Sequence, residues 1–216
     1  PRVPMKYKVI PVTPLQQNCT LLSCEETGKA AVVDPGGELD RIIAAAEELG
    51  VEIEKILLTH AHVDHAGGAG ELARRLGLPI EGPHRGDNFW IQALPDQSKA
   101  FGLPAAETFE PGRWLEQGDE VLVGNSRLEV RHCPGHTPGH VIFFQASDRV
   151  ALVGDVLFRG SIGRTDFPGS NHEQLLESIR TQLFSLGDEV EFISGHGPLS
   201  TIGHERKTNP FLSRYY

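Results

Sequence analysis

The sequence predicts a single-domain α/β protein in which helices and sizeable sheets form layers. Three observations lead to this prediction. The chain of 216 residues is long enough to bury a substantial core. Its apolar runs are mostly short and strand-like, and only three segments show helical periodicity. No linker or low-complexity tract divides the chain, so one layered domain is expected.

The first half of the chain is expected to contain five strands and two helices. The strands are short apolar runs bounded by Gly, Pro or polar residues, at 6–12, 20–24, 29–34, 54–59 and 79–81. The first helix spans 38–49 and ends at Gly50, and the second spans 69–76 and ends at Gly77. The inward face of the first helix is predicted to consist of Leu39, Ile42, Ile43, Ala46 and Leu49.

The second half is expected to begin with an irregular excursion. Residues 82–112 contain many helix breakers and little periodicity, so they are predicted to hold a short helix at most. Strands follow at 120–123, 127–133, 141–145, 149–154 and 190–194. A third amphipathic helix at 172–186, capped by Asn171 or Ser170, has an inward face made of Leu175, Leu176, Ile179, Leu183 and Leu186.

Charge and composition exclude several functions. The formal net charge is −9, which disfavours both nucleic acid and an anionic membrane surface as partners. No apolar run is long enough to span a membrane, and the N-terminus lacks the apolar stretch of a secretory signal. Three cysteines do not make a disulfide framework, so a cytoplasmic protein is expected. Met5 is the only methionine, so residues 1–4 are expected to remain from a cloning vector and the domain to span 5–216.

The densest cluster of polar residues directly follows the apolar run 56–58. It contains His60, His62, Asp64 and His65 within six positions, in a chain with ten histidines. Neutral imidazole and carboxylate oxygen are good ligands for zinc-like cations. His60 and His62, two positions apart in extended chain, can point to one side, whereas Asp64 and His65 can face a second cation. The cluster therefore indicates a metal site.

Three further candidate ligands follow later apolar strands. They are His136, Asp155 and His196. Each by itself is typical of turn chemistry. Together with the first cluster, however, they place metal-ligating groups at the ends of four strands, and such groups can converge on one cleft between sheets.

These residues carry a family resemblance. The string from Thr59 to His65, together with His136, Asp155 and His196, resembles the metallo-β-lactamase superfamily, and the chain is most similar to its glyoxalase II (hydroxyacylglutathione hydrolase) branch in the short bacterial form. The resemblance covers residues 5–212, including 33–37, 163–168 and 209–211. It implies a four-layer αββα sandwich with the site at one edge between the two sheets.

The resemblance also implies the roles of individual residues. One cation would be held by His60, His62 and His136, the other by Asp64, His65 and His196, and Asp155 would bridge them. The cations are expected to be divalent, zinc first, with iron or manganese as alternatives. A bridging hydroxide, steadied by Asp64, would attack the thioester carbonyl. The resemblance suggests that Asp34 orients a ligand histidine, although an Asp at the start of a turn is equally typical of a turn cap. Arg164 and Asp166 are expected to form a structural ion pair in a glycine-rich loop, and the alternative is that Arg164 lies near the substrate and contacts a carboxylate.

The expected activity is hydrolysis of S-D-lactoylglutathione-like hydroxyacyl thioesters, as in methylglyoxal detoxification, by a monomer or small homo-oligomer. The alternative is a glutathione persulfide dioxygenase with a single iron, which is similar over 163–167. Only twenty residues follow His196, so the thiol carrier stays open. A bridging Asp155 disfavours a β-lactamase, and the acidic charge disfavours a ribonuclease. A closed structural metal site is disfavoured because such sites are usually rich in cysteine.

Several other residues have competing interpretations. His140 is predicted to be a structural hydrogen-bonding residue, and His84, His132, His172 and His204 are likewise not expected to be ligands. Cys133 is predicted to be a small buried apolar residue. The aromatic residues Phe89, Trp90 and Phe101 are equally compatible with a substrate wall and with a minor core. Arg206, Lys207 and Asn209 could contact a carboxylate, but an exposed basic pair is more often only solvated.

Overall fold

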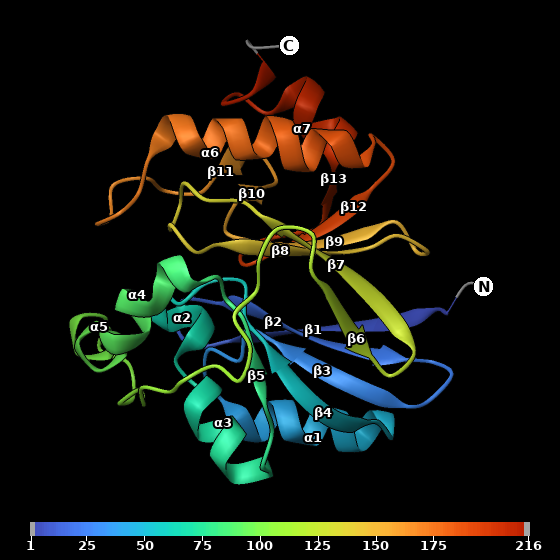
Figure 1. The fold of residues 1–216 in the computed structure, drawn as a ribbon, viewed down its shortest axis with the longest axis vertical. Helices are drawn as coiled ribbons and strands as arrows, with labels where there is room; N and C mark the ends of the chain where they lie inside the picture. The colour runs from blue at the N-terminus through green and yellow to red at the C-terminus, as the bar shows by residue number, and fades with distance from the viewer. Residues whose placement is uncertain (1–2, 214–216) are drawn as a thin grey trace.

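Two β-sheets pack face to face and helices cover both outer faces (Figure 1), which confirms the expected four layers. The computed structural model describes residues 3–213. Residues 1–2, in the segment expected to come from a vector, and 214–216, at the end of the expected domain 5–216, lie outside this range.

The first sheet contains five strands in sequential order. They are β1 (Met5–Val12), β2 (Gln17–Cys24), β3 (Lys29–Val33), β4 (Glu52–Leu57) and β5 (Ile80–Glu81). β1, β2 and β3 are antiparallel neighbours, whereas β4 and β5 continue the sheet in parallel. Parallel neighbours need crossover connections. These contain α1 (Leu39–Leu49) before β4, and α2 (Val63–Ala66) and α3 (Ala69–Leu76) before β5.

The second sheet contains six strands in the order β13-β12-β9-β8-β7-β6. Their bounds are β6 (Glu120–Val123), β7 (Ser126–His132), β8 (Val141–Gln145), β9 (Val150–Gly154), β12 (Glu191–Ser194) and β13 (Ser200–Thr201). The only parallel pair of this sheet, β9 and β12, is connected through α6 (His172–Ser178). α7 (Ile202–Thr208) follows β13, and β10 (Leu157–Phe158) pairs with β11 (Ser161–Ile162) in a small separate ribbon.

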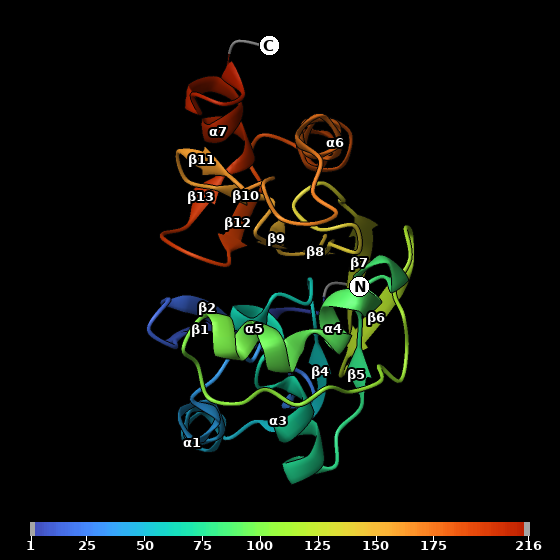
Figure 2. The same ribbon diagram turned by 90° about the vertical axis from the view of Figure 1, so that its left-hand side faces the viewer.

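Side-chain alternation along the strands builds the layers. In β8, Val141 and Phe143 belong to the core between the sheets, whereas Ile142 and Phe144 belong to the core under α6. β3 alternates in the same way, with Ala31 and Val33 between the sheets. Strands that are buried on both faces have continuous apolar runs in their sequence. Figure 2 shows the two sheets between the two helical layers.

The prediction for residues 82–112 was wrong in part. The segment contains a 3₁₀ turn, η1 (Arg85–Asp87), and two short helices, α4 (Asn88–Gln92) and α5 (Leu94–Ala100). Helices this short have little stability of their own and depend on tertiary packing. Ile91 and Leu94 supply that packing because both are fully buried in the core under the first sheet.

Other predicted elements hold with small corrections. The helix expected at 172–186 runs as α6, a π-helical turn η2 (Ile179–Leu183) and a 3₁₀ turn η3 (Phe184–Leu186), and the Asn171 side chain caps it. Leu49 is 51% exposed although it was expected to point inward. Periodicity gives the direction of a side chain but not whether another element covers it. The short elements α2, β10, β11, β13 and α7 were not foreseen.

Within residues 3–213, no helix combines the length and the apolar character needed to cross a membrane.

Candidate metal centre

The seven predicted ligands converge at one edge of the two sheets. His60 and His62 follow β4, and α2 carries Asp64 and His65. The others follow the ends of three strands of the second sheet: His136 after β7, Asp155 after β9 and His196 after β12. They form two groups, His60 with His62 and His136, and Asp64 with His65, Asp155 and His196, and the ligand atoms within each group lie within 4.8 Å of one another.

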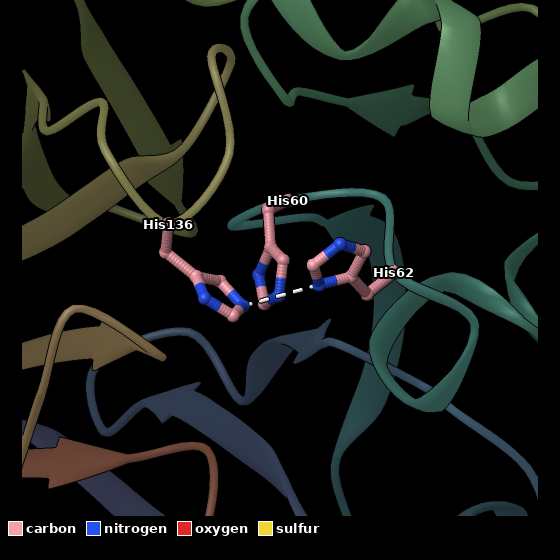
Figure 3. A group of neighbouring side chains, drawn as sticks. All are labelled: His60, His62 and His136. Carbon is pink, nitrogen blue, oxygen red and sulfur yellow. Dashed lines mark hydrogen bonds between the residues drawn. The ribbon is translucent and has the colours of Figure 1, made fainter. Parts of the chain in front are cut away.

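The first group consists of three buried imidazoles (Figure 3). Nδ1 of His62 lies 3.1 Å from Nε2 of His136, and the ring centroid of His60 lies 5.1 Å from each of the other two. Burial lowers the pKa of His60 well below its ordinary value and that of His62 to about 3, and the neighbouring histidines add to both shifts. These rings are therefore neutral and present lone pairs, as metal ligands must.

The second group contains two carboxylates. Nε2 of His196 lies 2.9 Å from Oδ2 of Asp64, and Nε2 of His65 lies 3.1 Å from Oδ2 of Asp155. That same Asp155 oxygen is also close to Nε2 of three other histidines: His60 at 3.7 Å, His136 at 3.6 Å and His196 at 3.8 Å. Asp155 thus lies between the two groups, as a bridging ligand would.

The electrostatics of the second group favour a cation. Burial alone would lower the pKa of His65, but Asp155, Asp64 and Asp34 outweigh it and raise the pKa well above the ordinary value. Burial would likewise raise the pKa of Asp155, yet His65 and the other rings hold it well below the usual range. Two buried carboxylates as close together as Asp64 and Asp155 stay ionised only when a positive charge lies near them.

The buried donor atoms fit a metal. Nε2 of His60 and His62 and Oδ1 of Asp155 have no hydrogen-bond partner among the described residues. Unpaired polar atoms are rare inside proteins, and each of these carries a lone pair. Gly195 keeps the space beside them open, because a Cβ at this position would lie 2.1 Å from Asp155 Oδ1 and 2.4 Å from His65 Cε1.

The outer ring nitrogens of four histidines have hydrogen-bond acceptors. His60 Nδ1 donates to Thr59 Oγ1 at 2.9 Å, His65 Nδ1 to Asp34 Oδ2 at 2.8 Å, His136 Nδ1 to the Arg164 carbonyl at 2.7 Å and His196 Nδ1 to the Leu15 carbonyl at 3.2 Å. A hydrogen bond on one ring nitrogen fixes the tautomer and leaves the other nitrogen for a metal. All four rings therefore have Nε2 available toward the site.

Asp34 lies where the resemblance placed it, beside a predicted ligand histidine. Besides contacting His65, its carboxylate accepts hydrogen bonds from the Thr59 amide at 2.8 Å and the Thr59 hydroxyl at 2.6 Å. The loop after β3 approaches α2 so closely that a Cβ on Gly36 would lie 1.7 Å from the Asp64 carbonyl oxygen. Glycine is required at this contact.

A cleft of about 750 Å³ opens beside the metal-ligating groups. Its walls are mainly apolar and include Trp90, Phe101, Phe158 and Phe167. Trp90 and Phe101 thus form part of the wall, whereas Phe89 is exposed and its ring centroid lies 4.9 Å from that of Trp90. A mostly apolar concave site with a few polar groups is typical of small-molecule binding.

Two arginines line this cleft. Arg164 donates to Asp166 with Nε at 3.0 Å and Nη2 at 2.8 Å, so the expected ion pair is present. Arg159 is exposed and has no hydrogen bond or ion pair with any residue in 3–213. Arg159 could not be foreseen from the sequence, because nothing in its local sequence indicates that it lines the cleft.

The structure also shows the roles of residues that were not expected to be ligands. His140 is confirmed as a hydrogen-bonding residue: its Nε2 accepts from the Asp155 amide at 3.1 Å, and its ring stacks on His60. Cys133 is buried, as expected, and burial raises the pKa of its thiol. His84 and His132 stack on each other. Arg206 pairs with Asp188 at 2.9 Å.

Two buried polar residues of the segment 82–112 were not foreseen. Asp87 accepts a hydrogen bond from the Ala61 amide at 2.9 Å, and Gln97 accepts one from the Val63 amide, also at 2.9 Å. Both therefore hold the loop that carries His60 and His62. Only the fold brings them there, and no sequence motif surrounds either residue.

A sandwich of two sheets with a cluster of histidines and aspartates at one edge is typical of a class of metal-dependent hydrolases. Residues 12–196 match the metallo-beta-lactamase superfamily, and the chain belongs to this family. Among curated proteins it is 47% identical over 210 residues to hydroxyacylglutathione hydrolase GloC of Haemophilus influenzae, which covers 97% of this chain and 99% of that protein.

Solved structures give the same fold. BLEG-1, named a B3 metallo-beta-lactamase, superimposes with a TM-score of 0.89 at 35% identity over 96% of this chain and 100% of its own. TTHA1623 in a di-iron-bound form gives 0.87 at 38% identity over 95% and 100%. ETHE1 from Myxococcus xanthus gives 0.81 at 25% identity over 98% and 86%.

Proposed function

We propose that this protein is a metal-dependent hydrolase of hydroxyacyl thioesters of the S-D-lactoylglutathione type. One observation carries the proposal: two groups of side chains able to hold metal ions lie beside an apolar cleft, and Oδ2 of Asp155, from the second group, lies 3.7 Å and 3.6 Å from Nε2 of His60 and His136 in the first. The 47% identity to a hydroxyacylglutathione hydrolase over nearly the whole of both chains supports the substrate class.

The proposed ligands are the seven residues that the sequence singled out: His60, His62 and His136 for one cation, Asp64, His65 and His196 for the other, and Asp155 for both. A pair of divalent cations would lower the pKa of a water molecule to roughly 7 and stabilise an oxyanion. Zinc remains the first candidate. Iron is the clear alternative, because the related TTHA1623 takes two irons.

The chain's own residues provide the rest of the chemistry. Asp64 lines the cleft, and its carboxylate would steady the attacking water by accepting a hydrogen bond from it. The buried imidazoles and apolar walls exclude bulk water from the carbonyl, which strengthens every polar contact there. The leaving thiol has an ordinary pKa near 8.5, so no strong general acid is needed.

The cleft suits a carboxylate-bearing thioester. Its aromatic wall can cover the acyl group and the methylene carbons, while Arg159 and Arg164 offer positive charge to a carboxylate such as those of glutathione. Hydrolysis of this kind would complete methylglyoxal detoxification. The expected cytoplasmic location and the monomeric or small oligomeric state stay predictions.

Two other reactions belong in the test. ETHE1 shares the fold, and a persulfide dioxygenase with a single iron was the alternative raised by residues 163–167. BLEG-1 is named a β-lactamase, although the carboxylate of Asp155 between the two groups disfavoured that activity for this chain.

The decisive experiment combines metal analysis with a substrate panel. Protein purified without added metal is analysed for zinc, iron and manganese, then assayed with S-D-lactoylglutathione, with glutathione persulfide in an oxygen electrode, and with a chromogenic cephalosporin. We expect two metals per chain and turnover of the thioester at least 100-fold above that of the other two. One iron with oxygen uptake, or faster β-lactam hydrolysis, would overturn the proposal.

A further inference from the structure

Asp87 connects the two loops that carry the first group of ligands. It lies at the junction of η1 and α4, is fully buried, and accepts three hydrogen bonds. Its Oδ2 accepts from the Ala61 amide at 2.9 Å and from the Thr137 hydroxyl at 2.9 Å, and its Oδ1 accepts from the Gly139 amide at 2.6 Å.

These donors belong to different sheets. Ala61 lies between His60 and His62 in the loop after β4, which is a strand of the first sheet. Thr137 directly follows His136 in the loop after β7, which is a strand of the second sheet. The single carboxylate of Asp87 therefore ties together the two loops whose histidines must approach each other across the sandwich.

No Lys, Arg or His side chain within residues 3–213 pairs with Asp87. Only its hydrogen-bond donors offset the burial of this carboxylate, and a buried acid is costly unless its oxygens are satisfied in this way. Neighbouring Gln97 has a narrower role, because its side chain bonds Ala61, Val63 and Trp90 but not the second loop. Unlike Gln97, Asp87 bonds both loops.

We propose that Asp87 is a positioning residue of the metal centre, which sets the separation of His62 and His136 by tying their loops together. The proposal rests on the proposed metal centre but not on the thioester substrate. The proposal adds a residue to the seven proposed ligands and Asp34. Asp87 is not a proposed ligand, and unlike Asp34 it does not bond the ring nitrogen of one.

The test compares variants that remove different numbers of the hydrogen bonds between Asp87 and the two loops. Asp87→Ala removes all three acceptor contacts. Asp87→Asn keeps the shape, but its amide NH₂ must face one of the three donors, so at least one bond is lost. Thr137→Val removes only the side-chain donor. Asp40→Asn is the matched control, because the Asp40 side chain is 88% exposed and lies outside the metal-ligating groups.

Metal-depleted protein is titrated with Co²⁺, whose visible spectrum reports the geometry of its ligands, and is separately unfolded in urea. We expect Asp87→Asn to bind the first Co²⁺ about 10- to 100-fold more weakly than wild type and with an altered spectrum. Thr137→Val should show a smaller effect of the same kind, and Asp40→Asn should match wild type. Asp87→Asn answers the question if Asp87→Ala does not fold.

A purely structural role gives a different result. Lower stability of metal-depleted Asp87→Asn, together with wild-type Co²⁺ affinity and spectrum, would overturn the proposal. Wild-type protein that binds no Co²⁺ would overturn both this proposal and the metal centre. Wild-type protein that binds two Co²⁺ but cleaves no thioester would refute the proposed function alone, and the role of Asp87 would still be decided by the titration.

Discussion

Oδ2 of Asp34 lies 2.8 Å from Nδ1 of His65, so a carboxylate in the loop after β3 holds a ring on α2 that is 31 positions away in sequence. The same carboxylate also accepts two hydrogen bonds from Thr59. Asp34 therefore contacts both ends of the segment from Thr59 to His65. The backbone at Asp34 has a φ of 56°.

Asp34→Asn is expected to weaken metal binding by about 10- to 100-fold and to lower thioester turnover in parallel. Asparagine tolerates the left-handed conformation at this position, so the fold should persist. The amide, however, offers one acceptor oxygen where the carboxylate offers two. Metal content after dialysis against a weak chelator measures the effect. A variant that retains wild-type metal content would contradict the orienting role.

His62→Ala should abolish hydrolysis and lower metal occupancy, because it removes one of the three donors of the first group. His204→Ala is the matched control, since its side chain is 53% exposed and belongs to none of the metal-ligating groups. Metal analysis and S-D-lactoylglutathione turnover are measured on the same preparations. Near-wild-type turnover of His62→Ala would show that the ligand assignment is wrong.

Gly195→Ala is expected to reduce metal stoichiometry and activity, although it adds only a methyl group. That methyl would lie 2.1 Å from Asp155 Oδ1 and 2.4 Å from His65 Cε1, which forces both ligands to move. Gly112→Ala is the control, because its Cβ would have only one neighbour within 4 Å, at 3.7 Å. If Gly195→Ala binds two metals with unchanged turnover, the space beside Gly195 is not part of the site.

The two cleft arginines should differ in their effect on substrate affinity. Arg159 has no partner within the described residues, whereas Arg164 is already held by Asp166. Arg159→Gln is therefore expected to raise KM for S-D-lactoylglutathione several-fold more than Arg164→Gln, with little change in kcat. An S-lactoyl thioester of N-acetylcysteamine, which lacks a carboxylate, should respond to neither change. Equal KM values for Arg159→Gln and wild type would exclude Arg159 from carboxylate binding.

The stability of the metal-free protein should be highest near pH 6.5. Burial lowers the pKa of His62 to about 3, and also lowers the pKa of His60, His136 and His140. Below pH 6.5, the ordinary pKa of histidine, these rings bind protons in the unfolded chain but stay neutral in the folded protein. The free energy of unfolding therefore decreases as the pH is lowered. His62 alone accounts for about 2 kcal/mol at pH 5.

The loss of stability above pH 6.5 has a separate cause. Neighbouring carboxylates raise the pKa of His65 and His196 above 6.5, although burial opposes this shift. These two histidines therefore contribute fully to the free energy of unfolding below pH 6.5, and the contribution is lost as the pH rises. Burial raises the pKa of Asp87 to about 6, which adds stability on acidification, but this is one group against four histidines. Urea unfolding of chelator-treated protein at pH 5, 6.5 and 8 measures the profile. A free energy of unfolding at pH 5 that equals or exceeds the value at pH 6.5 would contradict it.

Most strands could be predicted from the sequence because apolar runs between turn residues are a local signal. The short helices α4 and α5 could not, because they exist only where Ile91 and Leu94 reach the core. The seven proposed metal ligands were singled out from their chemistry, their places after strands and the family resemblance, and the structure brings them together in two groups. Asp87 and Arg159 carry no such signal, and the distance between them and the site depends on residues far along the chain.

The sequence by itself determined which donor groups this protein presents and that each follows an apolar strand, since chemistry and local patterning are written along the chain. Only the tertiary structure decided which of them meet. The packing of one sheet on the other brings His62 against His136 and places Asp155 between the two groups. Within residues 3–213, the fold also pairs Arg164 with Asp166 and gives Arg159 no such partner in the cleft. Contacts between sheets arise from the burial of both apolar faces together, and no single segment contains that information.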